Sequence, residues 1–391
     1  MIETLFLLIF GEVVVGGGGR TFAMGTISLR MLLFVAGLLA TSVGLLSSGR
    51  SRDGVPTAAL LVLAFFASML PGLLVDAGRG TPPDIVFEEI QPLLFWLSAP
   101  FFAFAFQDVR TINRAGSLIV YGGLTVAIVT SLLMVGLSMG VVNFGALYLW
   151  SEETGEFIFR GPTNFFYKGH FFVGVALVFV VVLTPRWWKS MVFVLALSLG
   201  LSLTRGLYLA VAVTLALSFV SGRRRVAIMI VAVAAILLLG LYSQAILDLL
   251  FDPSRASSAE TRSRDLSFFL ATFDYSTLLL GEGAGTLLNG RANIENSFLW
   301  AIWRFGVMGL AFMLLPLMMA ARYFSEIPFD SDVRKPASAF FFGIVMLYIV
   351  TAFNPFVNNS IGLTYLLCAL FALRRMREMA REATALPEPT A

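Results

Sequence analysis

Residues 281–310 read GEGAGTLLNGRANIENSFLWAIWRFGVMGL and contain the two kinds of segment on which the fold is built. A glycine-rich turn is followed by a polar segment that carries Arg291, Asn293, Glu295 and Asn296. An apolar helix is then predicted to begin at once and to run to about Ala320. A polar cluster that opens an apolar helix at a boundary with water is a favourable place for chemistry, since charges deeper inside are costly.

The composition indicates a membrane protein. The chain of 391 residues is 58% hydrophobic and 13% charged, whereas a soluble domain has roughly 25% charged residues. The net charge of +3 gives no indication of nucleic-acid binding. The single cysteine, Cys368, lies in an apolar run, which excludes a disulfide framework and a cysteine metal site. The acidic Glu3 and the lack of a cleavage pattern indicate that the first helix is retained.

The predicted fold is an all-α polytopic membrane protein with about twelve transmembrane helices, because a spanning helix needs ~20 apolar residues and packed bundles accept shorter ones. One transmembrane domain, residues 1–376, is expected, with a long outer loop before the tenth helix. The predicted helices lie near residues 2–15, 27–47, 55–75, 92–106, 117–141, 171–184, 190–204, 206–221, 225–243, 297–320, 338–353 and 361–373.

The positions of Lys and Arg predict the orientation. More than half of the 27 lie in the tail or in loops on the side of the N-terminus, most clearly in the short connections 185–189 and 222–225. Cytoplasmic loops are enriched in these residues, so both termini are expected to be cytoplasmic. The polar segment 377–391 is predicted to be a disordered cytoplasmic tail.

Two outer loops, residues 142–170 and 244–296, are longer than the others. In the second, an amphipathic helix is predicted that lies on the membrane or caps the bundle, because Leu266, Phe269, Leu270 and Phe273 recur at helical spacing.

Arg262 and Arg264 precede these apolar positions. Arginine presents a fork of donors that matches phosphate oxygens. The alternative is that both arginines are solvated, with Asp265 neutralising one of them. In a strand-like segment the two would point to the same side, whereas on a helix they would diverge.

Three arginines lie within or between apolar runs: Arg30, Arg205 and Arg304. For Arg30 and Arg304, pairing with a carboxylate or a helix dipole, or snorkelling, is favoured over a role in binding. Arg205 lies in a polar turn with Ser202, Thr204 and Gly206, and there both interpretations remain open.

Other polar residues allow a functional or a structural interpretation. Glu295 is either an acid in the first turn of a helix capped by Asn293 or a general base. His170 is expected to be a hydrogen-bonded surface residue. Glu152, Glu153 and Glu156 are expected to form an acidic face in water rather than a cation site, and no metal site is predicted.

Together these segments resemble the O-antigen ligase and polymerase superfamily, over about residues 165–315. Three features carry the resemblance. The first is the Ser-x-Thr-Arg-Gly turn of Ser202, Thr204, Arg205 and Gly206. The second is a long loop with Arg264 or Arg262 ahead of a short amphipathic helix and the turn of Gly281, Gly283 and Gly285. The third is the pair Glu295 and Asn296, opening a helix that carries Gly306 and Gly309.

The resemblance implies a GT-C-type glycosyltransferase of the bacterial inner membrane. It would act at the periplasmic face on undecaprenyl-diphosphate-linked oligosaccharide, with inversion and without a metal or cofactor. Its implied partners are a glycan or lipid-linked acceptor, membrane lipids and a chain-length regulator, with no nucleic acid.

The residue roles follow from the same resemblance. Arg205 and Arg264 would bind the diphosphate, and Glu295 would be the catalytic base. The further candidate contacts with substrate are Arg262, Arg291, Asn296 and Arg304, together with Arg160, Lys168 and His170 in the glycan-handling loop 142–170. Ligases typically have histidine where Glu295 stands here, which favours a polymerase over a ligase.

Two classes compete with this interpretation. A transporter would also have many helices and intramembrane arginines, but the sequence shows no repeated halves. A structural subunit of an envelope assembly predicts that Arg205 and Glu295 can be replaced without loss.

Overall fold

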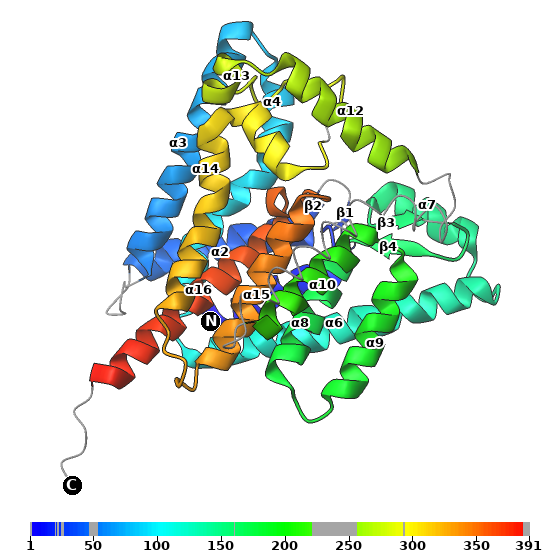
Figure 1. Ribbon diagram of the computed structural model, residues 1–391, viewed down its shortest axis with the longest axis vertical. Helices are drawn as coiled ribbons and strands as arrows, with labels where there is room; N and C mark the ends of the chain where they lie inside the picture. Colours follow the sequence, from blue (N-terminus) through cyan, green and yellow to red (C-terminus); the bar gives the residue numbers. More distant parts are fainter. Residues whose placement is uncertain are drawn as a thin grey trace.

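A bundle of apolar helices forms the molecule (Figure 1). The computed structural model describes residues 2–19, 21, 23–24, 27–46, 54–159, 161–220, 256–291 and 294–385. Helices suit such an apolar chain because every backbone N–H and C=O must find a partner within the protein when no water is present. The bundle consists of α1 (Ile2–Gly16), α2 (Leu29–Leu46), α3 (Val55–Arg79), η1 (Gln91–Ser98), α5 (Ala99–Ala105), α6 (Val109–Ser138), α8 (His170–Leu183), α9 (Trp188–Ser202), α10 (Arg205–Val220), α14 (Ser297–Ser325), α15 (Arg334–Thr351) and α16 (Ser360–Ala385).

The shorter elements gather at one end of this bundle, which we call the outer end because it holds the long loops. Two antiparallel strand pairs lie there, with Ala23 opposite Ser28 and Phe157 opposite Tyr167. The opposite end is the inner end, where α1 begins and α16 ends. The outer elements are β1 (Ala23–Met24), β2 (Ile27–Ser28), α4 (Pro83–Ile90), α7 (Phe144–Thr154), β3 (Phe157–Phe159), β4 (Phe165–Tyr167), α12 (Ala256–Thr272), α13 (Tyr275–Leu280) and η3 (Phe356–Asn358).

The helical segments agree closely with those predicted. Every predicted apolar segment within the described residues is helical, and segment 225–243 lies outside them. Five helical stretches are long and apolar enough to cross a membrane, namely Val55–Arg79, Pro83–Ala105, Val109–Ser138, Ser297–Ser325 and Arg334–Thr351. The chain is therefore polytopic, while the number twelve and the cytoplasmic side of the termini stay predictions.

The C-terminal tail differs from the prediction. Helix α16 continues to Ala385, so the segment from residue 377 is helical for most of its length. Charged pairs extend the helix beyond its apolar part, with Arg374 pairing with Glu378 and Arg381 reaching Glu326 directly after α14. Pairs at i and i+4 stabilise a helix, and this local charge pattern outweighed the polar composition.

The short helix α8 and the apolar part of α16 form the centre of the bundle. Residues 170–180 and 361–373 are buried without interruption. Phe171 stacks on Phe356 and meets Tyr365 edge to face. A helix that is apolar on all sides is buried on all sides, which explains why these two helices show no polar face.

Helix α14 is broken at Gly306, and the glycine-rich turn of residues 281–285 fastens onto the break. Gly306 has φ 64° and ψ −158°, which interrupts the helical backbone. In the turn before it, the carbonyl oxygens of Trp303 and Arg304 accept hydrogen bonds from the N–H groups of Glu282 (2.6 Å) and Gly283 (3.3 Å). These bonds satisfy carbonyl groups that a kink would leave without partners.

Asp76 of α3 holds the other side of the same turn. Its buried carboxylate accepts hydrogen bonds from the N–H groups of Ala284 (2.6 Å) and Gly285 (3.3 Å). A Cβ on Gly283 would stand 2.5 Å from Asp76 Oδ1, so the close approach requires glycine. The turn therefore joins α3 to α14.

Helix α13 leads into this turn and is capped by Asp274. The Asp274 carboxylate accepts a hydrogen bond from the Thr277 N–H (2.8 Å). This bond, and further ones from Ser276 and Thr277, hold the pKa of Asp274 below its usual value. In the turn that follows α13, Glu282 pairs with Arg79 of α3 (2.6 Å).

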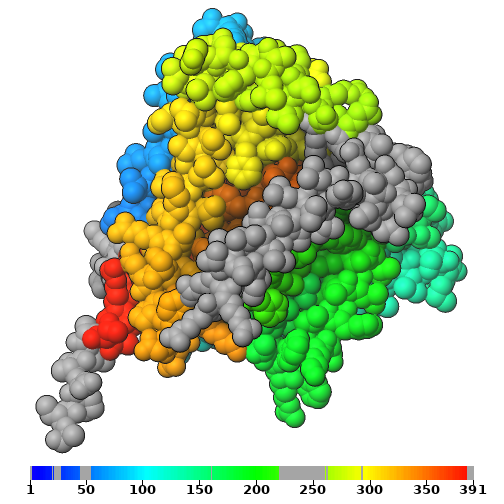
Figure 2. Space-filling view, viewed as in Figure 1, coloured from blue at the N-terminus to red at the C-terminus, as the bar shows by residue number. Residues whose placement is uncertain are grey.

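Helix α12 crosses the outer end from α13 toward α7 (Figure 1), and in the space-filling view α12 and α13 lie above the outer end of α14 (Figure 2). Phe269 of α12 is buried and meets the indole of Trp303 at 6.1 Å between ring centroids. The predicted apolar face is only partly correct, because Leu266 and Leu270 are exposed. The helix caps the bundle through Phe269 and Phe273.

We predict that Gly306→Ala destabilises the protein. Its backbone conformation is one that essentially only glycine adopts, at a cost of about 1–3 kcal/mol for other residues. A Cβ would also stand 2.6 Å from the Leu279 carbonyl oxygen. Thermal unfolding in detergent, followed by tryptophan fluorescence, should show a lower midpoint. Gly78→Ala on α3 is the matched control, because a Cβ there has no neighbour within 4 Å. Equal midpoints for the two variants would contradict the role given to Gly306.

Candidate active site

Glu295 and Asn296 stand at the beginning of α14, at the outer end. The Asn296 side-chain oxygen accepts hydrogen bonds from the N–H groups of Phe298 (3.0 Å) and Leu299 (3.1 Å), so Asn296 is the N-cap. The prediction that Asn293 caps this helix was wrong in its residue, and Asn293 lies outside the described residues. Glu295 immediately precedes the cap and is half-buried. It therefore lies at the boundary where α14 enters the bundle.

Arg205 is the first residue of α10 and follows a tight turn from α9. Leu203 in this turn has φ 51°, a left-handed conformation. Gly206 packs against the ring of Phe353, where a Cβ would stand 2.8 Å from the Phe353 Cβ. Glycine therefore lets α10 approach the end of α15, and this contact places the half-buried Arg205 beside that end.

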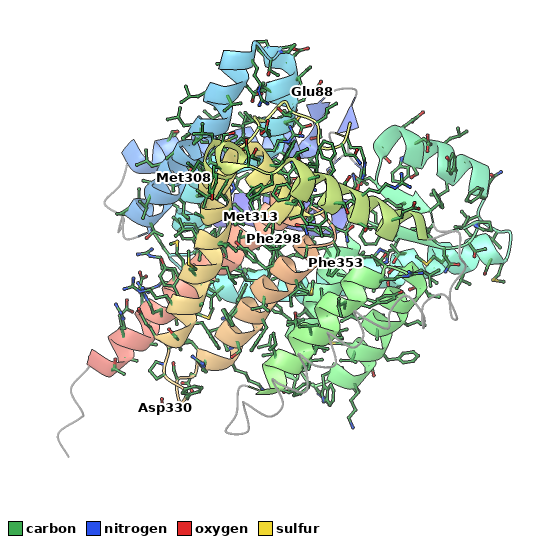
Figure 3. The ribbon with its side chains drawn as sticks, turned by 45° about the horizontal axis from the view of Figure 1, so that its top comes forward. Glu88, Phe298, Met308, Met313, Asp330 and Phe353 are labelled. Carbon is green, nitrogen blue, oxygen red and sulfur yellow. The ribbon has the colours of Figure 1, made fainter. Side chains whose placement is uncertain are left out.

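An apolar groove extends inward from this point. It has a volume of about 460 Å³ and is lined by Leu209, Val213, Phe298, Leu317, Val345, Tyr348, Ile349, Ala352 and Phe353. Arg205 lies four and eight positions before Leu209 and Val213, so the three residues share one face of α10. Phe298 and Phe353, which line the groove from α14 and from the end of α15, are labelled in Figure 3.

The arginines of the outer loop lie on helix α12 and just after α13. Of the two geometries left open for Arg262 and Arg264, the structure has the helical one, since both positions belong to α12 and two positions at this spacing diverge on a helix. Arg264 is exposed and pairs with Glu260 one turn away (2.6 Å). From the sequence, Asp265 was considered as a partner of Arg262 or Arg264. In the structure, its carboxylate pairs instead with Arg291 (2.9 Å). The structure thus gives Arg264 a solvent-facing position and Arg291 a bridging one.

Arg304 lies inside the bundle, where its side chain is fully buried. It pairs with Glu89 of α4 at 3.3 Å. The favoured interpretation of Arg304 as a paired charge is confirmed. Its burial does not suit its place among the candidate substrate contacts, because the side chain holds α4 against α14.

The loop 142–170 folds over the bundle and buries its histidine. His170 has no exposed surface, and its Nδ1 accepts a hydrogen bond from the Tyr167 N–H (2.9 Å). The predicted surface position of His170 is wrong, because the β3–β4 hairpin covers the start of α8; a contact of His170 with glycan stays a prediction. Lys168 is half-buried in the same hairpin, and Arg160 lies outside the described residues.

The structure contains a second cluster of buried charges, and Arg30 is its only member that the sequence singled out as a possible ion-pair partner. Arg30 donates hydrogen bonds to both carboxylate oxygens of Glu12 (2.8 and 3.1 Å), which confirms the paired interpretation. Glu156 is fully buried and accepts a hydrogen bond from the Gly18 N–H, so the expectation of an acidic face in water was wrong for this residue. Glu12 and Asp76 stand within apolar runs, and such intramembrane acids are themselves a signal of paired or functional groups.

The outer end therefore separates two kinds of charge. Arg304 and Arg30 are held in buried ion pairs, whereas Arg205 and Glu295 lie half-buried where α10 and α14 begin. Among the described residues, no three His, Cys, Asp or Glu side chains are grouped as metal ligands. A cationic turn beside an apolar groove has the chemistry to receive an anionic head group that is attached to an apolar chain.

The comparisons with known proteins bear on the same question. No protein-family model matches the chain. The chain is 28% identical to an O-antigen polymerase of Shigella flexneri over 381 residues, which cover 90% of this chain and 95% of that protein. The similarity thus extends over nearly the whole of both chains, and it supports the resemblance indicated by the motifs: the chain is similar to an O-antigen polymerase.

Proposed function

We propose that the chain is a polysaccharide polymerase, a membrane glycosyltransferase that joins lipid-diphosphate-linked glycan units at the outer end of the bundle. The full-length similarity to an O-antigen polymerase supports the general activity. The observation that carries the proposal for this chain is the position of Arg205, on the same face of α10 as two residues that line the apolar groove. A polyprenyl diphosphate has the matching chemistry, with an anionic head on a long apolar chain.

In the proposed reaction, a hydroxyl of the acceptor sugar attacks the anomeric carbon of the donor glycan. A new glycosidic C–O bond forms while the bond to the lipid diphosphate breaks, and the diphosphate leaves with the electron pair. Attack opposite to the leaving group inverts the anomeric carbon. Glu295 takes the proton from the attacking hydroxyl as general base. The growing chain is thereby transferred to the next lipid-linked unit.

The negative charge that grows on the leaving diphosphate is stabilised by arginine. Arg205 presents its guanidinium at the start of α10, where fixed donors act more strongly than in bulk water because less solvent screens them. Arg264 joins it from α12 in this proposal. Its present partner, Glu260, forms an exposed pair that contributes about 0–1 kcal/mol, so exchanging it for a phosphate costs little.

The direct test is a product assay with the purified chain and a lipid-diphosphate-linked oligosaccharide, performed with and without a chelator. A ladder of lengthening products is expected, unchanged by the chelator. Transfer of a single block to an added acceptor would replace the proposal with a ligase. No consumption of the donor would favour a transporter, for which flux across vesicles is the next measurement.

We predict that Arg205→Ala lowers the rate of polymer formation by at least ~100-fold, the usual effect of removing one charge-stabilising donor. Arg205→Lys should restore only part of the activity, because an ammonium lacks the planar fork. Membrane abundance and the melting midpoint should be unchanged. Arg322→Ala is the control, since Arg322 is an exposed arginine at the inner end. Full activity of Arg205→Ala would exclude the proposed diphosphate site.

We predict that Glu295→Gln lowers kcat by ~100- to 10,000-fold, the range for loss of a general base, with little change in KM. The amide keeps the size of the side chain but accepts no proton. Glu88→Gln is the matched control, because Glu88 is an exposed glutamate on α4 at the same end (Figure 3). If Glu295→Gln behaved like the control, Glu295 could not be the base.

A further inference from the structure

A second cavity lies at the opposite, inner end of the bundle, far from the proposed active site. It has a volume of about 200 Å³ and lies between the start of α3, the end of α5 and the C-terminal half of α16. Phe106 and Phe371 contribute an apolar wall, and Arg374, Arg375, Glu378 and Glu382 contribute charged groups. We call this cavity the inner pocket.

The inner pocket lies where three apolar segments end together. Helix α3 begins at Val55, helix α5 ends at Ala105, and the buried apolar part of α16 ends at residue 373, directly before Arg374. In a membrane protein, such a shared boundary marks the level at which the hydrocarbon gives way to the polar headgroup region. A molecule that fits this pocket should itself have an apolar part and a polar head, as a phospholipid has.

The charges of the inner pocket are balanced. Arg374 Nη2 lies 2.6 Å from Glu378 Oε1, and Arg375 Nη1 lies 2.8 Å from Glu382 Oε1. Purely basic pockets at this level suit anionic headgroups. Here two carboxylates stand among the two arginines, so a headgroup with a single net negative charge meets repulsion as well as attraction. A headgroup that carries both signs finds a partner for each.

One donor in the pocket has no acceptor. Arg375 Nε is buried and makes no hydrogen bond within the described part of the chain. A buried donor without a partner is destabilising, and a phosphate oxygen would satisfy it once the Arg375 side chain, which is 25% exposed, turns toward the pocket. Glu382 is 64% exposed and stands at the rim, where it can accept hydrogen bonds from an ammonium group. Arg375 and Glu382 follow each other along α16, so the phosphate and the ammonium of phosphoethanolamine, which also follow each other, could bind to them in turn.

We propose that the inner pocket binds the phosphoethanolamine headgroup of a membrane phospholipid, with its phosphate on Arg374 and Arg375 and its ammonium on Glu382 and Glu378. The acyl chains extend along the apolar wall formed by Phe106 and Phe371. The bound lipid fastens α16 to the ends of α3 and α5. This site is independent of the proposed polymerase reaction.

Native mass spectrometry of the delipidated full chain tests the proposal, with phosphatidylethanolamine, phosphatidylglycerol and phosphatidylcholine added in turn. Phosphatidylethanolamine should bind at least about tenfold more tightly than the other two, the difference expected for one charge-assisted hydrogen bond. Equal or tighter binding of phosphatidylglycerol would overturn the proposal in favour of an anionic-lipid site. Equal binding of phosphatidylcholine, or retention of no lipid, would also overturn it.

Two variants assign the site. Glu382→Gln should abolish the preference for phosphatidylethanolamine over phosphatidylglycerol, and Arg375→Ala should weaken both lipids by about tenfold or more. Glu382 is exposed, so its replacement should leave folding intact. Arg322→Ala is the control, because Arg322 is an exposed arginine at the same end that does not line the pocket. An unchanged preference in Glu382→Gln would exclude the proposed ammonium contact.

Discussion

The hydrocarbon interior of a membrane offers no hydrogen-bond partners, and the outer end of this protein depends on how that constraint is met. Helix α14 breaks at Gly306, and the N–H groups of Glu282 and Gly283 occupy carbonyl oxygens of the turn before the break. Asp76 fixes the other side of the same glycine-rich turn. The long outer loop is thereby attached to α14 and α3 through its backbone.

The same constraint arranges the charges. A buried charge is tolerated when it is paired, and the deep arginines Arg30 and Arg304 each face a carboxylate. Their partners come from other helices, so each pair joins two elements of the bundle. Arg205 and Glu295 differ in position, because Arg205 is the first residue of α10, Glu295 lies just before α14, and both are half-buried. Charges that hold the bundle together lie deep, and the charges proposed for catalysis lie at its mouth.

The sequence predicted the helices well because an apolar run has few alternatives in a membrane. It predicted that Arg304 would be paired, but it could not supply Glu89, which lies far away in the chain. His170 was placed at the surface because it stands at the outer end of an apolar run, and only the folding of the β3–β4 hairpin buries it. For α12, periodicity found the helix, yet packing against Trp303 selected Phe269 and left Leu270 exposed.

The proposed site follows from the way three helices meet. Helices α10 and α14 enter the bundle on either side of the end of α15, and all three line the apolar groove. A lipid chain in that groove would bring its diphosphate toward Arg205, with the attached sugar extending outward toward the start of α14 and Glu295. Helix α12 crosses above this end of the bundle (Figure 1). In the proposed reaction, Glu295 before α14 would take the proton of the attacking hydroxyl, and Arg205 on α10 would bind the leaving diphosphate on the other side of the sugar. Attack opposite to the leaving group is the arrangement that inversion at the anomeric carbon requires.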